Sequence, residues 1–114
     1  MITIFHNPKC SKFRQTLELL RQRHLDPRVV NYLETPPTVE ELRDILRKLG
    51  MRPRELLRRQ ETACVELGLT DPQLSDEALI RAMSRHPIVI ERPIVVTATR
   101  AALGRPPEQV LSIL

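Results

Sequence analysis

The chain is poor in features that would assign it to several large classes of protein. Aromatic residues make up only 3% of its 114 residues, and no apolar run approaches the roughly 18 residues of a membrane span. With few aromatics, no dense basic run and no recognisable reading helix, the sequence does not indicate a nucleic-acid-binding domain. The N-terminus lacks the charged start and long apolar segment of a secretory signal. We therefore expect a cytoplasmic protein with neither a membrane nor a nucleic-acid partner.

Cysteine is equally scarce. Cys10 and Cys64 are the only two, which fits a reducing compartment and does not resemble a disulfide framework. The three histidines are scattered, without a second ligand at zinc spacing, so we expect no metal site. The motif Cys10-Ser11-Lys12-Phe13 is not C-x-x-C. If Cys10 undergoes redox turnover, an external thiol must therefore reduce it.

Positive charge exceeds negative charge, with 18 Lys and Arg against 14 Asp and Glu and a net charge of +4. The apolar share of 41% is ordinary for a globular protein, and the length predicts a single domain over residues 1–114. Arginines spaced along a chain usually form a solvated surface. The alternative is that some of them converge on an anion.

The first residues carry the strongest chemical signal. An apolar strand over residues 2–5 runs through the turn at Asn7-Pro8 and delivers Cys10 to the start of an amphipathic helix. The helix dipole and the unpaired N–H groups there favour a thiolate, whose pKa falls below the usual ~8.5 of a cysteine. The alternative interpretation is a small buried hydrophobic residue. A helix start is also a place where an oxyanion binds.

The remaining pattern predicts a mixed α/β fold. A helix over about residues 11–24 and a strand over 29–33 complete a parallel βαβ unit, and Thr38 and Glu41 form a capping box. A largely helical insertion then occupies about residues 38–86. Strand patterns follow at 88–90, 94–96 and 101–103, the last two as a hairpin, and a final helix opens at Arg105.

Five motifs follow one another along the chain. They are His6-Asn7-Pro8-Lys9-Cys10-Ser11, Tyr32-Leu33-Glu34-Thr35-Pro36, Arg54-Glu55-Leu56-Leu57-Arg58, Glu91-Arg92-Pro93-Ile94-Val95-Val96 and Gly104-Arg105-Pro106-Pro107-Glu108. In this order they resemble the glutaredoxin-coupled arsenate reductase family, which has a thioredoxin-like fold. The likeness covers essentially the whole chain, and the resemblance implies a thioredoxin-like mixed sheet flanked by helices, with a helical insertion.

The resemblance also implies the site residues. It places the nucleophile at Cys10 and the three arginines that hold the oxyanion at Arg58, Arg92 and Arg105, although Arg59 is an alternative to Arg58. It implies a cis peptide bond before Pro93. The supporting residues are His6, Ser11 and Pro93, and His6 either polarises the site or shapes the turn.

The implied activity is arsenate reduction without a bound cofactor. The Cys10 thiolate attacks arsenate, glutathione acts as co-substrate and leaves a mixed disulfide on Cys10, and glutaredoxin is the partner that clears it. One alternative is a general glutathione-dependent thiol oxidoreductase. Another is an Spx-like redox regulator that binds RNA polymerase, although Phe13 stands where such a regulator has its second cysteine. Phe13 also departs from the small hydroxyl residue common in the family, and Cys64 is expected to serve packing.

Overall fold

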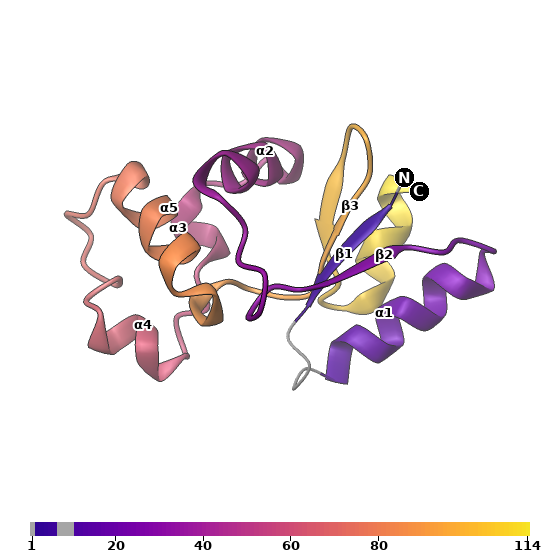
Figure 1. Cartoon of the computed structure of the whole chain (residues 1–114), viewed down its shortest axis with the longest axis horizontal. Helices are drawn as coiled ribbons and strands as arrows, with labels where there is room; N and C mark the ends of the chain where they lie inside the picture. Colours follow the sequence, from indigo (N-terminus) through magenta and orange to yellow (C-terminus); the bar gives the residue numbers. More distant parts are fainter. Residues whose placement is uncertain (1, 7–10) are drawn as a thin grey trace. The chain divides into compact units, whose positions relative to one another are not determined.

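The computed structural model describes residues 2–6 and 11–114 of the chain, with the side chain of Ser11 left out. The described residues fold into two compact units (Figure 1). One combines residues 1–35 with residues 92–114 and contains the sheet; the other, residues 36–91, is helical. The predicted helical insertion, residues 38–86, falls within the second unit.

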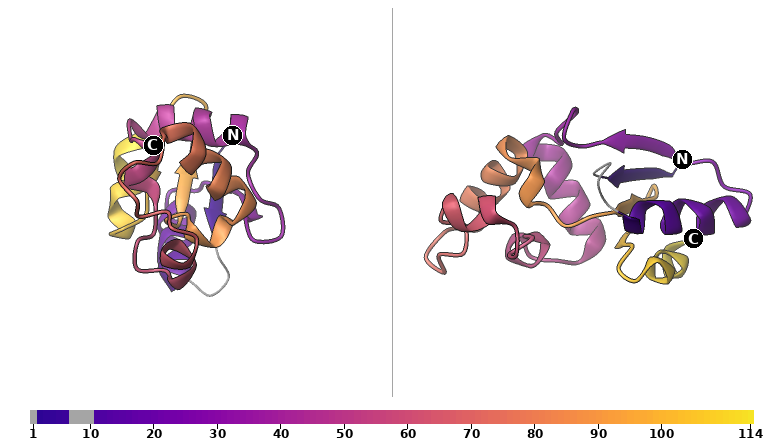
Figure 2. Two further views of the ribbon diagram at one scale, coloured as in Figure 1. Left: turned by 90° about the vertical axis from the view of Figure 1, so that its left-hand side faces the viewer. Right: turned by 90° about the horizontal axis from the view of Figure 1, so that it is seen from below.

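The sheet has four short strands in the order β2-β1-β3-β4. The first two are parallel, as the right-hand view of Figure 2 shows, and the other neighbours are antiparallel. The predicted parallel pair and the predicted hairpin are thus confirmed. The strands are β1 (Thr3–His6), β2 (Arg28–Asn31), β3 (Ile94–Val96) and β4 (Ala101–Leu103).

Apolar residues from the sheet and two helices form the core of this unit. Ile4 and Val95 are partners in the β1–β3 register, and both are fully buried together with Leu20 and Val110. Because side chains alternate along a strand, His6 lies on the same face of β1 as Ile4. Helix α1 (Ser11–Gln22) and the 3-10 helix η2 (Pro107–Ile113) pack side by side.

Helix α1 ends two residues before the predicted boundary at His24. The N–H of Leu25 donates to the carbonyl of Leu20, and the N–H of His24 donates to that of Arg21. His24 has a left-handed backbone with a φ of 60°. This pair of bonds is the Schellman arrangement, which satisfies the last carbonyls of a helix and turns the chain toward β2.

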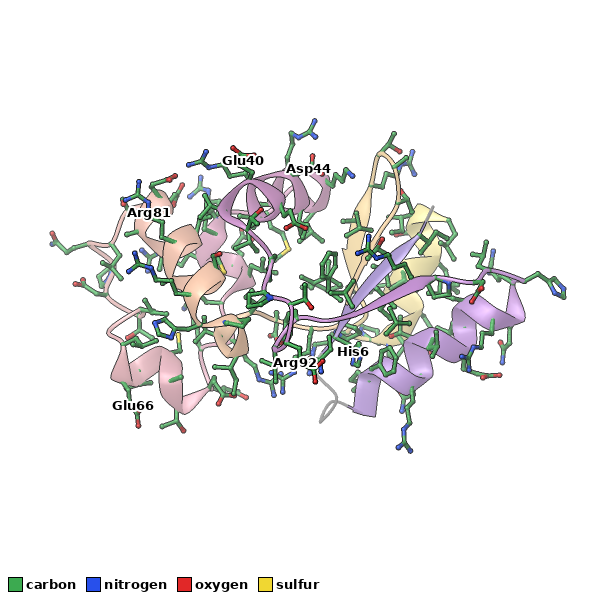
Figure 3. All side chains as sticks on the ribbon, viewed as in Figure 1. His6, Glu40, Asp44, Glu66, Arg81 and Arg92 are labelled. Atoms are coloured by element: carbon green, nitrogen blue, oxygen red, sulfur yellow. The ribbon has the colours of Figure 1, made fainter. Side chains whose placement is uncertain are left out.

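The helical unit is built around α2 and α5, which pack against each other. The predicted capping box is present, with Thr38 and Glu41 each accepting a hydrogen bond from the other's backbone N–H. Charged side chains such as Glu40 and Asp44 point away from α2 (Figure 3). The elements are α2 (Val39–Leu49), α3 (Pro53–Leu56), α4 (Thr62–Glu66), α5 (Asp76–Arg85) and the 3-10 helix η1 (Pro87–Val89).

Two predicted elements differ in the structure. The strand predicted at residues 88–90 is wrong, because Pro87 begins the single 3-10 turn η1 and only Ile90 forms a bridge, to Leu57. An apolar run of three residues carries no periodicity that separates a strand from a turn of helix. The final helix is present, but as the 3-10 helix η2.

Gly104 lies where α1 and the β3–β4 region approach closely. A Cβ atom at this position would stand 2.5 Å from Oγ1 of Thr16 and 2.9 Å from Cγ of Pro93. The N–H of Gly104 donates to the carbonyl of Pro93 at 2.9 Å. Glycine is therefore favoured at this position because a Cβ atom would clash with its neighbours, and not because the backbone has a positive φ.

The capping box predicts a measurable share of stability. We expect Thr38→Ala to lower the free energy of unfolding by about 1 kcal/mol, because the N–H of Glu41 loses its acceptor. Urea denaturation measures this difference. Thr70→Ala, in an exposed turn, is the matched control and should change the stability by less; equal losses for the two variants would contradict the cap's contribution.

The close approach at Gly104 predicts a second effect on stability. Gly104→Ala should lower the free energy of unfolding by about 1–3 kcal/mol, because the added methyl group overpacks the contact with Thr16 and Pro93. In the double variant with Thr16→Ala, the added loss from the Gly104 change should be smaller. An unaltered urea midpoint for Gly104→Ala would contradict this packing.

Candidate functional site

The predicted nucleophile, Cys10, lies outside the described residues, as do residues 7–9 of the same motif. The structure does describe the helix that follows it. Helix α1 begins at Ser11, the next residue in the sequence, and has no acidic residue in its first turn. The positive end of this helix is therefore not neutralised by a carboxylate of its own first turn.

His6, at the end of β1, is buried and packs against α1. Its ring stacks on Phe13 with centroids 3.8 Å apart and planes at 16° (His6 is labelled in Figure 3). The fold thus gives His6 a packing contact at the start of the helix. Phe13, which departs from the family pattern, makes that contact.

Arg92 and Pro93 open the segment that leads into β3. The peptide bond between them is cis, so the expected cis bond before Pro93 is confirmed. Arg92 is buried, with only 7% of its surface exposed. A second cis bond joins Arg105 to Pro106, and the sequence reasoning missed it, although Arg-Pro pairs at both places were visible.

The structure brings Arg105 to the backbone of Arg92. Nε of Arg105 donates to the carbonyl oxygen of Arg92 at 2.6 Å, while the neighbouring Gly104 N–H donates to Pro93. Two of the three predicted arginines, thirteen residues apart in sequence, are therefore tied together in the sheet unit. The hydrogen bond fixes the direction of the Arg105 guanidinium.

Arg58 belongs to the helical unit and follows α3. Its Nη1 donates to Oε1 of Glu91 at 3.2 Å, and its Nε lies 3.8 Å from Oε2 of Glu61. Its side chain is 26% exposed, whereas the neighbouring Arg59 is an exposed residue. The structure thus gives Arg58 a defined orientation, and the two carboxylates that hold it were missed by the sequence reasoning.

Cys64, the second cysteine, is a free and fully buried residue of α4. Burial raises the pKa of its thiol, an effect partly offset by the positive charge of Arg59. A buried thiol with a raised pKa is protonated at neutral pH and reacts poorly as a nucleophile. Cys64 therefore has the properties of a packing residue.

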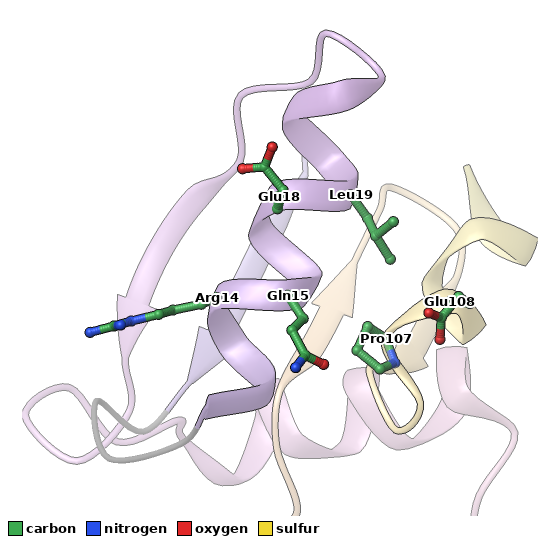
Figure 4. Close-up of a pocket in the computed structure, with 6 residues that line it drawn as sticks. All are labelled: Arg14, Gln15, Glu18, Leu19, Pro107 and Glu108. Carbon is green, nitrogen blue, oxygen red and sulfur yellow. The ribbon is translucent and has the colours of Figure 1, made fainter.

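A groove of about 400 Å³ lies along α1 and η2 (Figure 4). Gln15 and Leu19 point from α1 toward Pro107 and Glu108, whereas Arg14 points away from them. The lining of the groove mixes both signs of charge and contains none of the predicted site residues.

Two other kinds of site are absent from the described residues. No cluster of His, Cys, Asp and Glu there could hold a metal ion, and no helix there is long and apolar enough to cross a membrane.

Comparisons with known proteins agree with this architecture. The solved structure of an arsenate reductase from Vibrio cholerae superposes with a TM-score of 0.95 at 54% sequence identity, covering 99% of this chain and 97% of that one. The uncharacterized protein YfgD of Escherichia coli strain K12 is 54% identical over 114 residues, covering 99% of this chain and 96% of its own length. An arsenate reductase of Neisseria meningitidis serogroup B is 47% identical, with coverages of 99% and 97%.

These likenesses confirm the expected fold, a mixed four-stranded sheet of the thioredoxin-like type flanked by helices. A model of the ArsC family also matches residues 5–113, which is nearly the whole chain. The full-length match, the identity to the relatives and the agreement of the folds point to one family. The chain belongs to the ArsC family.

Proposed function

We propose that this protein is an arsenate reductase that uses Cys10 as its nucleophile and Arg58, Arg92 and Arg105 to bind the oxyanion. The observation that carries the proposal is the anchoring of the Arg105 guanidinium on the backbone of the buried Arg92, in a chain of the ArsC family. Its relatives from Neisseria meningitidis and Vibrio cholerae are named arsenate reductases, which supports the choice of substrate.

The charge of the substrate explains why arginines suit this role. Arsenate is a dianion near neutral pH, so binding it beside a thiolate brings negative charges together. A guanidinium stays charged at any physiological pH and binds an oxyanion through two parallel N–H bonds. Because Arg92 is 93% removed from solvent, an anion that it binds is weakly screened by water and interacts with it more strongly.

The chemistry follows in two bond exchanges. The Cys10 thiolate attacks arsenic to form a sulfur–arsenic bond, and one arsenate oxygen leaves as water after taking up protons. A glutathione thiolate then attacks the Cys10 sulfur. The sulfur–arsenic bond breaks with its electron pair remaining on arsenic, which passes from As(V) to As(III), and the new disulfide joins glutathione to Cys10.

Glutaredoxin completes the cycle by thiol–disulfide exchange, taking the glutathionyl group from Cys10 and restoring the thiolate. No bound cofactor is needed, since glutathione enters as a co-substrate. Both reductants place the reaction in the cytoplasm. His6, packed on Phe13, and Pro93 support the site by shaping the backbone on either side of it, and Ser11 does so as the first residue of α1.

The proposal predicts arsenate-dependent oxidation of NADPH when glutathione, glutathione reductase and glutaredoxin are supplied. Cys10→Ser should reduce this turnover to the uncatalysed background, because the adduct with arsenic cannot form. Cys64→Ser, the matched control at the buried cysteine, should retain turnover if it folds. Arsenate-independent disulfide exchange that persists without Arg58, Arg92 and Arg105 would instead favour a general thiol oxidoreductase.

The anion site predicts protection of the nucleophile. Arsenate or sulfate should slow alkylation of Cys10 by iodoacetamide competitively, and Arg92→Ala should abolish that protection and lower turnover by about 10²-fold or more. Arg100→Ala removes an exposed arginine of the same unit and should leave the protection intact. Circular dichroism checks that the Arg92 variant is folded; protection retained by a folded Arg92→Ala would overturn the assignment.

A further inference from the structure

We propose that Glu91 is a positioning residue for the oxyanion site: its carboxylate orients the guanidinium of Arg58 before arsenate binds. This inference rests on the proposed function, because it assigns Arg58 a place in that site. It adds a residue to which neither the family resemblance nor the comparisons give a role. In this proposal Glu91 orients an anion-binding arginine, and the next residue, Arg92, binds the anion itself.

The backbone places the two side chains in register. The N–H of Arg58 donates to the carbonyl of Val89 at 2.7 Å, and the N–H of Glu91 donates to that of Leu56 at 2.9 Å. Between these bonds, Leu57 and Ile90 form an antiparallel bridge, and both are buried. The positions of Arg58 and Glu91 are therefore fixed by main-chain bonds and core packing, and not by the ion pair itself.

The contacts with Glu91 and Glu61 determine which nitrogen atoms of the Arg58 guanidinium face carboxylates. Glu91 accepts from Nη1, and Glu61 lies nearest to Nε at the longer distance of 3.8 Å. Neither contact uses Nη2. An arginine binds a tetrahedral anion through the Nη1 and Nη2 pair or through the Nε and Nη2 pair, and Nη2 is common to both. Both side chains of the Arg58–Glu91 pair are about three-quarters removed from solvent, so the pair is screened less than a surface ion pair.

The orienting effect of Glu91 and its negative charge predict opposite changes in anion affinity when Glu91 is removed. Glu91 and Glu61 together carry more negative charge than Arg58 offsets, so charge alone would make removal of Glu91 tighten the binding of an anion. A long side chain that is already fixed loses less conformational freedom when its ligand arrives. The geometry favours orientation, because a hydrogen-bond acceptor at Glu91 is what holds Nη1 in place.

Two variants of Glu91 separate these effects. Glu91→Ala removes the acceptor and should raise both the KM for arsenate and the arsenate concentration that half-protects Cys10 by about tenfold, with a much smaller change in kcat. Glu91→Gln keeps an acceptor oxygen and loses the charge, so it should stay within about threefold of the native protein. Glu77→Ala is the matched control, since Glu77 pairs with Arg43 and Arg81 in the same unit.

The outcomes decide between the interpretations. Tighter arsenate binding in both Glu91 variants would make Glu91 a competitor of the anion, and a lowered melting temperature with unchanged KM in Glu91→Ala would make its role structural; either result overturns the inference. In an Arg58→Ala background, Glu91→Ala should have no further effect on KM, and an undiminished effect there would also overturn it. The proposed function fails separately, and the inference with it, if the native protein shows neither arsenate turnover nor protection by arsenate or sulfate.

Discussion

The backbone from Val89 to Pro93 is the constraint on which the predicted anion-binding residues depend. Its carbonyl at Val89 fixes the main chain of Arg58, and its carbonyl at Arg92 receives the side chain of Arg105. Arg92 is itself part of this segment. Val89 thus fixes the backbone of Arg58 within the helical unit, and Arg92 fixes Arg105 within the sheet unit.

The conformation of this segment has both local and long-range causes. Pro87 starts a 3-10 turn that Ile90 leaves in an extended conformation, and Ile90 then bridges to Leu57. The carbonyl of Pro93 accepts the N–H of Gly104, where an added Cβ atom would crowd Thr16 and Pro93. Proline, glycine and a buried apolar pair thus hold the backbone from which the proposed anion-binding residues extend.

The elements that sequence reasoning predicted correctly are those whose cause lies within a few residues. The capping box at Thr38 and Glu41 is a local hydrogen-bonding pattern, and the β1–α1–β2 spacing leaves few alternatives to a parallel pair. The error at residues 88–90 arose where three apolar residues fit two conformations. The partners of Arg58 could not be predicted, because Glu91 is 33 positions away in the sequence and becomes a neighbour only through the Leu57–Ile90 bridge.

The stacking of Phe13 on His6 has a consequence for how the proposed redox chemistry could change in evolution. A cysteine at position 13 would create a C-x-x-C pair and allow the protein to resolve its own disulfide. The same substitution would remove an aromatic ring that packs against β1 and the sheet core, leaving a cavity that destabilises the fold. Under the proposed function, a protein that keeps this ring also keeps its dependence on an external thiol, so a packing contact would limit the source of its electrons.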